Sequence, residues 1–168
     1  MIILSYAVII RGPLGCGKTT VAESLAKILK ADHISIDRSL EEHGLDKVDE
    51  YIGCVPLGNF IKATDTILPR VEKDLQNGRV VIIDSCFYHK EAIEYLTGKL
   101  KCKFYAFDLK APLETCIRRD ADRQKPHGTA AAKAVYSLVS RFDYGVTIDV
   151  TKPLEDAVKD IIARLPTS

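Results

Sequence analysis

The sequence predicts an α/β domain in three layers, with a five-stranded, mostly parallel sheet flanked by helices. Short apolar runs rich in β-branched residues alternate along the chain with longer amphipathic segments, which is typical of this fold class. The chain of 168 residues is long enough to bury a full core, and it contains no repeat or linker. We therefore predict a single domain over residues 1–168.

Five apolar runs are predicted to form the strands. They carry apolar residues at nearly every position, because parallel strands are covered on both faces. The runs are 4–10, 33–36, 80–84, 102–109 and 145–150.

Six amphipathic segments are predicted to form helices. In the first of them, Val21, Leu25 and Ile28 follow each other at spacings of three and four, which places them on one helix face. The segments are 18–29, 60–76, 90–99, 112–121, 129–140 and 153–164.

Composition excludes several other classes. The net charge of +1 argues against a protein that coats nucleic acid. The five cysteines are scattered without a C-x-x-C pair, so we expect reduced thiols in a cytoplasmic protein. The first ten residues lack the basic start of a secretory signal, and no run of about 18 apolar residues could cross a membrane. The prediction is a cytoplasmic chain with no membrane partner.

A glycine-rich loop, GPLGCGKT at residues 12–19, matches the phosphate-binding pattern G-x-x-x-x-G-K-[ST]. Its backbone N–H groups and the start of the next helix would cradle the phosphates of ATP. Lys18 would bridge the β- and γ-phosphates, and the Thr19 hydroxyl would bind Mg²⁺. We therefore predict ATP and Mg²⁺ as cofactors. The predicted nucleotide-binding residues of this segment are Gly12, Pro13, Leu14, Gly15, Cys16, Gly17, Lys18, Thr19 and Thr20.

A second motif is the run VVIID, which ends at Asp84. An aspartate at the carboxyl end of a buried strand beside such a loop is the usual second Mg²⁺ ligand, although aspartates also end strands for structural reasons. The next residue is Ser85, where ATPases that drive mechanical work usually carry a glutamate. This difference favours transfer of phosphate to a substrate over transfer to water.

Two further segments are predicted to face the phosphates. Asp37 and Arg38 end the second predicted strand, where Asp37 could take the proton of an attacking hydroxyl. An equally good interpretation makes Asp37 the N-cap of a following helix. Segment 85–90 follows the Mg²⁺ aspartate, and we expect Ser85 and Tyr88 to contact the acceptor, with aromatic packing as the alternative.

Two polar regions interrupt the regular alternation and are candidate flaps over the site. We expect residues 37–59 to bind the acceptor and residues 120–130 to form a lid, because ligands bind beyond the carboxyl ends of parallel strands. Arg119 and Arg123 lie four apart, so they would share a helix face if the helix continued, and could stabilise the transferring phosphoryl group. The alternative is a solvated helix end.

Together these motifs resemble the small P-loop kinases, most of all the branch with polynucleotide 5′-kinases, chloramphenicol phosphotransferases and zeta-toxin-type kinases. The resemblance implies a P-loop NTPase fold with sheet order 2-3-1-4-5. It also implies that Asp37 is the catalytic base and that Arg38 contacts acceptor or phosphate. Arg119 would lie near the adenine and Arg123 near the phosphates.

The function predicted is Mg²⁺-dependent transfer of the γ-phosphate of ATP to a hydroxyl acceptor, with Lys18, Asp37 and Arg123 as catalytic residues. The acceptor would be a small metabolite or a polynucleotide 5′ end, so nucleic acid enters only as acceptor. A GTPase switch is disfavoured because Asp-x-x-Gly and Asn-Lys-x-Asp are missing from their positions. A P-loop ATPase or a nucleotide-binding regulatory protein without an acceptor stays open as the alternative.

Overall fold

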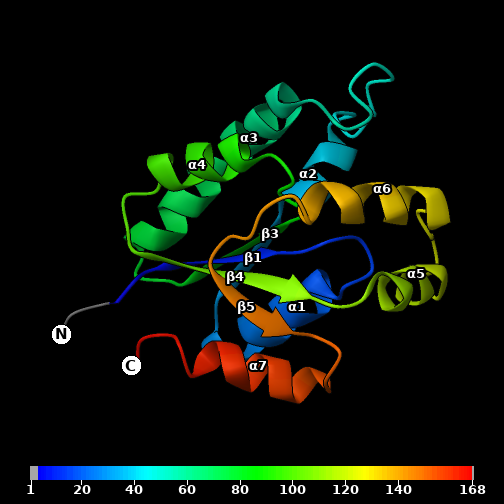
Figure 1. The fold of residues 1–168 in the computed structure, drawn as a ribbon. Coiled ribbons are helices and arrows are strands. Elements are labelled where there is room, and N and C mark those ends of the chain that lie inside the picture. Colours follow the sequence, from blue (N-terminus) through cyan, green and yellow to red (C-terminus); the bar gives the residue numbers. More distant parts are fainter. Residues whose placement is uncertain (1–3, 168) are drawn as a thin grey trace.

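The computed structural model describes residues 4–167 of the chain (Figure 1). Its centre is an all-parallel sheet in the order β2-β3-β1-β4-β5, which confirms the predicted fold class and strand order. The strands are β1 (Ala7–Arg11), β2 (Asp32–Ser35), β3 (Val81–Ser85), β4 (Phe104–Lys110) and β5 (Val146–Asp149). Every residue of β1 and β3 is buried, as their continuous apolar runs predict.

Seven helices surround this sheet in the described part of the chain. Six correspond to the predicted segments. Helix α2 was not among those segments, and a helix after Asp37 was expected only in the capping alternative. None of the helices among residues 4–167 is both long and apolar enough to span a bilayer. The helices are α1 (Lys18–Leu29), α2 (Ile36–Glu42), α3 (Leu57–Gln76), α4 (Lys90–Lys99), α5 (Leu113–Ala121), α6 (Thr129–Val139) and α7 (Leu154–Ile162).

The helices form layers on both faces of the sheet. Successive side chains of a strand point to opposite faces, so Ile9 packs with apolar residues of α2, α3 and α4, whereas Val8 and Ile10 pack with α1 and α7. Figure 1 shows α3 and α4 over one face, and α1 and α7 over the other. Helix α6 closes the first layer by contributing Val139 to it.

The carboxyl ends of the central strands meet at one edge. In the parallel register Arg11 of β1 pairs with both Ser85 of β3 and Asp108 of β4, and Ser35 of β2 pairs with Asp84. The loops that leave these strands therefore begin side by side. This alignment brings segments far apart in the sequence to one site.

Helix α2 changes the interpretation of Asp37. The predicted strand 33–36 ends one residue early, at Ser35, and Ile36 begins α2. Ser35 is the N-cap, because its side chain accepts a hydrogen bond from the Arg38 N–H at 3.2 Å. The capping interpretation of Asp37 is therefore wrong, and its carboxylate is free for other partners.

The positions of Arg119 and Arg123 also differ from the prediction that they share one helix face. Helix α5 ends at Ala121, so Arg119 lies on its last turn and Arg123 lies beyond it. The two side chains do not share a helix face. They reach the same cavity from different elements instead.

Candidate active site

The loop between β1 and α1 has the geometry of an anion cradle. Gly15 and Gly17 have φ values of +77° and +97°, which residues with a Cβ rarely adopt. A Cβ on Gly15 would lie 2.1 Å from the carbonyl oxygen of Cys116 on α5, so this position also requires glycine for space. The chain then enters α1 at Lys18, and the first residues of that helix line the cavity, so the start of the helix can contribute to an anion site.

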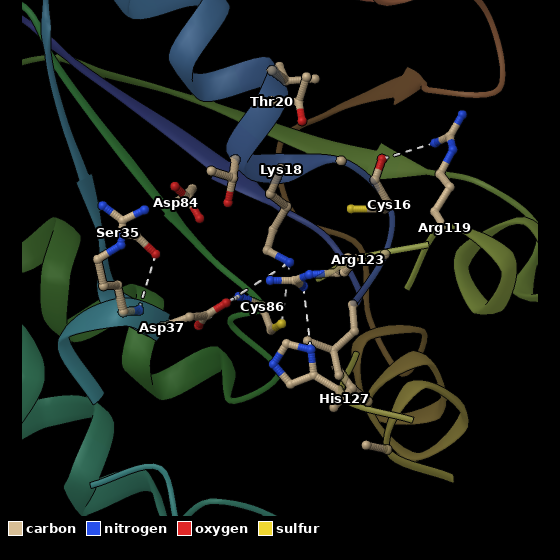
Figure 2. Close-up of a pocket in the computed structure, with 18 of the residues that line it drawn as sticks. Cys16, Lys18, Thr20, Ser35, Asp37, Asp84, Cys86, Arg119, Arg123 and His127 are labelled. Carbon is tan, nitrogen blue, oxygen red and sulfur yellow. Dashed lines mark hydrogen bonds and ion pairs between the residues drawn. The ribbon is translucent and has the colours of Figure 1, made fainter. Parts of the chain in front are cut away.

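Lys18 is buried at the centre of the site (Figure 2). Its Nζ donates to the Pro13 carbonyl at 3.1 Å and lies 3.5 Å from Cys86 Sγ and 4.0 Å from Asp37 Oδ2. Burial opposes its charge, but the neighbouring Cys86, Cys16, Asp37 and Asp84 outweigh burial and raise the pKa of Lys18. The lysine therefore stays protonated and presents a desolvated positive charge.

Asp37 is held by residues at the end of β3. The Ser85 hydroxyl donates to Asp37 Oδ1 at 2.6 Å, and the Cys86 N–H lies 3.2 Å from Oδ2 and 3.3 Å from Oδ1. The Asp37 side chain is 29% exposed, so it keeps access to the cavity. Ser85 itself is fully buried and is not among the residues that line the cavity. Ser85 was expected to contact the acceptor, but its hydroxyl binds Asp37 instead.

Asp84 has a partner that was not anticipated from the sequence. Nε2 of His33, on β2, contacts Asp84 Oδ2. The Asp84 side chain is almost fully buried, yet it lines the same cavity as Thr19 and Asp37. Mg²⁺ prefers oxygen ligands, and one hydroxyl and two carboxylates at this edge fit that preference.

The two arginines occupy different ends of the site (Figure 2). Arg119 donates to the Cys16 carbonyl at 3.2 Å and to the Val150 carbonyl at 2.8 Å, which ties α5 to the phosphate loop and to the end of β5. Arg123 lies beside Lys18, and its Nη1 atom is 3.4 Å from Nδ1 of His127. Arg123 is exposed, so its guanidinium is free to turn toward an incoming phosphate.

The lid segment, residues 120–130, is organised by Asp120. This buried carboxylate accepts hydrogen bonds from the N–H groups of His127 at 3.2 Å and Gly128 at 2.9 Å, and it contacts His127 Nδ1 at 3.1 Å. Burial disfavours its charge, but these hydrogen bonds hold the pKa of Asp120 below its usual value. His127 Nε2 also lies 3.9 Å from Glu41 of α2, so the lid segment reaches across to the opposite wall.

These elements enclose one cavity of about 720 Å³, a size that suits a nucleotide together with a small second ligand. It runs from the phosphate loop to α2 and the lid segment. Gly12, Pro13 and Ser85 of the predicted site residues do not line it. Those that do are Leu14, Gly15, Cys16, Gly17, Lys18, Thr19, Thr20, Asp37, Arg38, Asp84, Tyr88, Arg119 and Arg123.

Several residues near the cavity carried no signal in the sequence. His33, Cys86 and His127 belong to no motif, and their contacts arise because distant elements meet at one edge. The polar stretch around Asp120 marked the lid as a region, but it did not identify the aspartate that organises it.

Known proteins resemble this chain over most of its length. A family model described as an AAA domain matches residues 8–143. Among curated proteins no significant match is found.

Solved structures with the same arrangement include kinases. A gluconokinase from Sinorhizobium meliloti superposes with a TM-score of 0.70 at 15% identity, covering 94% of this chain and 89% of that chain. An APS kinase from Mycobacterium tuberculosis, solved in complex with AMPPNP and APS, has a TM-score of 0.72 at 15% identity, with coverages of 95% and 96%. A sugar kinase from Janibacter has a TM-score of 0.67 at 15% identity, with coverages of 95% and 93%. At these identities the similarity shows a shared fold.

Proposed function

This chain belongs to the family described as an AAA domain, and we propose that it transfers the γ-phosphate of ATP to a hydroxyl group of a small acceptor. Its fold is that of the small P-loop kinases. The observation that carries the proposal is the pairing of Lys18 and Asp37, whose Nζ and Oδ2 atoms are 4.0 Å apart in one cavity. A phosphate-binding cation and a candidate general base thus lie side by side, where the γ-phosphate and the acceptor hydroxyl would meet.

In this proposal the acceptor hydroxyl lies against Asp37, which takes its proton. The acceptor oxygen attacks the γ-phosphorus, the bond from that phosphorus to the β–γ bridging oxygen breaks, and ADP leaves with the electron pair. Lys18 and Arg123 stabilise the charge that spreads over the transferring group. Asp84 and Thr19 are the residues that would hold Mg²⁺, which neutralises phosphate charge when bound.

The contacts around Asp37 favour an alcohol over water as the nucleophile. Ser85 follows Asp84 at the position where a glutamate would orient water, and its hydroxyl donates to Asp37. Asp37 lies on α2, next to the part of the cavity that is lined by that helix and the loop after it. A carboxylate in this place can reach a second ligand as well as the nucleotide.

The experiment that tests the function follows the γ-phosphate. The protein is incubated with γ-labelled ATP and Mg²⁺, alone, with a small-molecule cell extract, and with 5′-hydroxyl oligonucleotides. We expect slow release of inorganic phosphate without an acceptor, and a labelled phosphate ester with the extract.

Two lysine variants control this assay. Lys18→Ala should lower transfer by at least about a hundredfold, because the cation on the γ-phosphate is lost. Lys62→Ala, on the exposed side of α3, should leave transfer unchanged. Rapid hydrolysis that no acceptor stimulates would instead support an ATPase.

A further inference from the structure

We infer that the acceptor is a neutral or cationic hydroxyl compound with a largely apolar body, rather than a polyol or an acid. This inference rests on the proposed function, and it names the substrate class of the same cavity. It follows from the side chains that line the part of the cavity between α2, α3 and α6, and from the positions of the polar groups among them.

The interior of this part is apolar. Six apolar side chains line it from α2, the loop after α2, α3 and α6, and Phe60 also packs edge-on against the ring of Tyr88, with 5.2 Å between the ring centroids. Leu40, Val55 and Phe60 are at most 8% exposed, so they form its inner wall. The six are Leu40, Val48, Val55, Phe60, Ala131 and Val135. A hydrocarbon or aromatic part of a ligand would displace water from this wall, and the burial of apolar surface would favour binding.

Few polar groups inside lack a partner, because Ser35 is occupied as the N-cap of α2 and His127 is bonded within the lid segment. Asp37 is assigned to the reacting hydroxyl, and the Tyr88 hydroxyl accepts a hydrogen bond from the Val55 N–H at 3.0 Å, which leaves its proton for one further contact. A polyol brings several hydroxyl groups, and each one that finds no partner weakens binding by roughly ten- to a hundredfold. This wall therefore selects against sugars and sugar acids.

The charged residues at the mouth of the cavity also favour a neutral or cationic acceptor. Arg38, Glu41 and Asp46 line the cavity and are exposed, so two carboxylates stand there beside one arginine. Glu41 also faces His127, at 3.9 Å, from across the cavity. Of the other lining cations, Lys18 and Arg123 are assigned to the phosphates of ATP. Arg119 and Lys152 lie at the far end of the cavity, beside the end of β5 and the start of α7. An acceptor with its own carboxylate or phosphate would meet uncompensated negative charge at this mouth.

The test measures binding separately from transfer. With AMPPNP and Mg²⁺ present, the dissociation constants of 2-phenylethanol, 4-(hydroxymethyl)benzoate, glycerol and gluconate are measured by ligand-observed NMR. We expect 2-phenylethanol to bind at least about tenfold more tightly than each of the other three. Equal or weaker binding of 2-phenylethanol, including none that can be detected, overturns the inference.

Two variants of one loop locate the binding. Val48 and Ile52 are similarly exposed, at 60% and 56%, but only Val48 lines the cavity. Val48→Asn should weaken 2-phenylethanol binding by about threefold or more, because it replaces apolar contact area with a polar group. Ile52→Asn should leave the binding unchanged. Equal effects of the two variants would place the ligand elsewhere and contradict the inference.

Failure of the inference and failure of the proposed function give different results. If the apolar alcohol binds as expected but the γ-phosphate reaches no acceptor, the transfer function fails and the ligand class of the cavity stands. If transfer occurs to gluconate or glycerol in preference to 2-phenylethanol, the kinase function stands and the inferred acceptor class is wrong.

Discussion

Asp37 owes its position to hydrogen bonds from another strand. It lies on the first turn of α2, and both the Ser85 hydroxyl and the Cys86 N–H from the end of β3 bind its carboxylate. Such bonds fix the direction in which a carboxylate points. In the proposed function, Asp37 would therefore need no movement of its own before the acceptor arrives.

Removing the Ser85 hydroxyl should therefore impair transfer without affecting nucleotide binding. Ser85→Ala leaves Asp37 with the Cys86 N–H alone, and we expect kcat to fall by about tenfold or more. The affinity for AMPPNP, measured by calorimetry, should stay within about twofold. Ser137→Ala, an exposed serine on α6, serves as the control. An unchanged kcat in Ser85→Ala would remove Ser85 from the mechanism.

The sequence predicted which residues form the site better than it predicted the side chains that these residues contact. Lys18, Asp37 and Asp84 stand out because each belongs to a motif or ends an apolar run. The contact between His33 and Asp84 could not be predicted, because it depends on the register of β2 against β3. A pairing of strands 50 residues apart leaves no local pattern.

Among the elements, the phosphate loop depends most on glycine. Gly15→Ala would place a Cβ against the Cys116 carbonyl at a φ of +77°, so the loop or α5 must shift. We expect loss of AMPPNP affinity by at least about tenfold and a lower melting temperature.

Gly98→Ala on α4 is the matched control for the phosphate loop. Gly98 has open space around its Cβ position and no positive φ. Alanine there should stabilise the helix by roughly 0.5–1 kcal/mol. Normal nucleotide binding by Gly15→Ala would contradict the assigned loop geometry.

The lid segment should show a dependence on pH that Asp120 causes. Its folded-state pKa is lowered, so its contribution to stability is present above its ordinary pKa of about 4 and disappears as the pH falls through the lowered value. The difference in unfolding free energy between wild type and Asp120→Asn should be constant from pH 7 to about pH 5 and shrink below about pH 4. Asp122→Asn, an exposed neighbour, should show no such change. A difference that grows on acidification would contradict this role.

Helix α2 is the one helix of the described residues that the sequence did not predict as a segment. Its seven residues follow β2 directly, and the apolar Ile36 at its start continues the pattern of the strand. The helix is stabilised locally by Ser35 as N-cap, and by the burial of Ile36 and Leu40, which is a tertiary effect. The longer helices α1 and α4 match their predicted bounds, because their apolar spacing is visible over three turns.

Over the whole molecule, Arg11 connects the layers. It is fully buried, with Nη1 2.8 Å from Asp108 Oδ2, and it also donates to carbonyls of the segment after β3 and of the end of α6 and the loop beyond it. Its guanidinium lies 4.1 Å from the ring centroid of Phe142. Strand β1 is thereby bound to the segment after β3 and to α6. The predicted strand 4–10 stopped one residue before Arg11, and nothing in the local sequence indicated this role.

Breaking the pair of Arg11 and Asp108 should be among the most destabilising changes in this protein. Arg11→Leu leaves the buried Asp108 with only Lys110, 3.4 Å away, as an ionic partner, and should cost about 3–5 kcal/mol in urea unfolding. The double variant Arg11→Leu/Asp108→Leu should lose less than the sum of the single variants. Lys90→Leu, which breaks the exposed pair with Glu94, should cost less than about 1 kcal/mol. Additive losses in the double variant would show that the buried pair is not coupled.

The central claim is that Asp37 activates an acceptor hydroxyl beside the γ-phosphate that Lys18 binds. Its most direct test compares wild type and Asp37→Asn in the transfer of labelled γ-phosphate to the extract, with AMPPNP affinity measured in parallel. We predict that Asp37→Asn lowers ester formation by at least about a hundredfold while nucleotide affinity changes by less than about twofold. Ester formation at the wild-type rate by Asp37→Asn would contradict the claim.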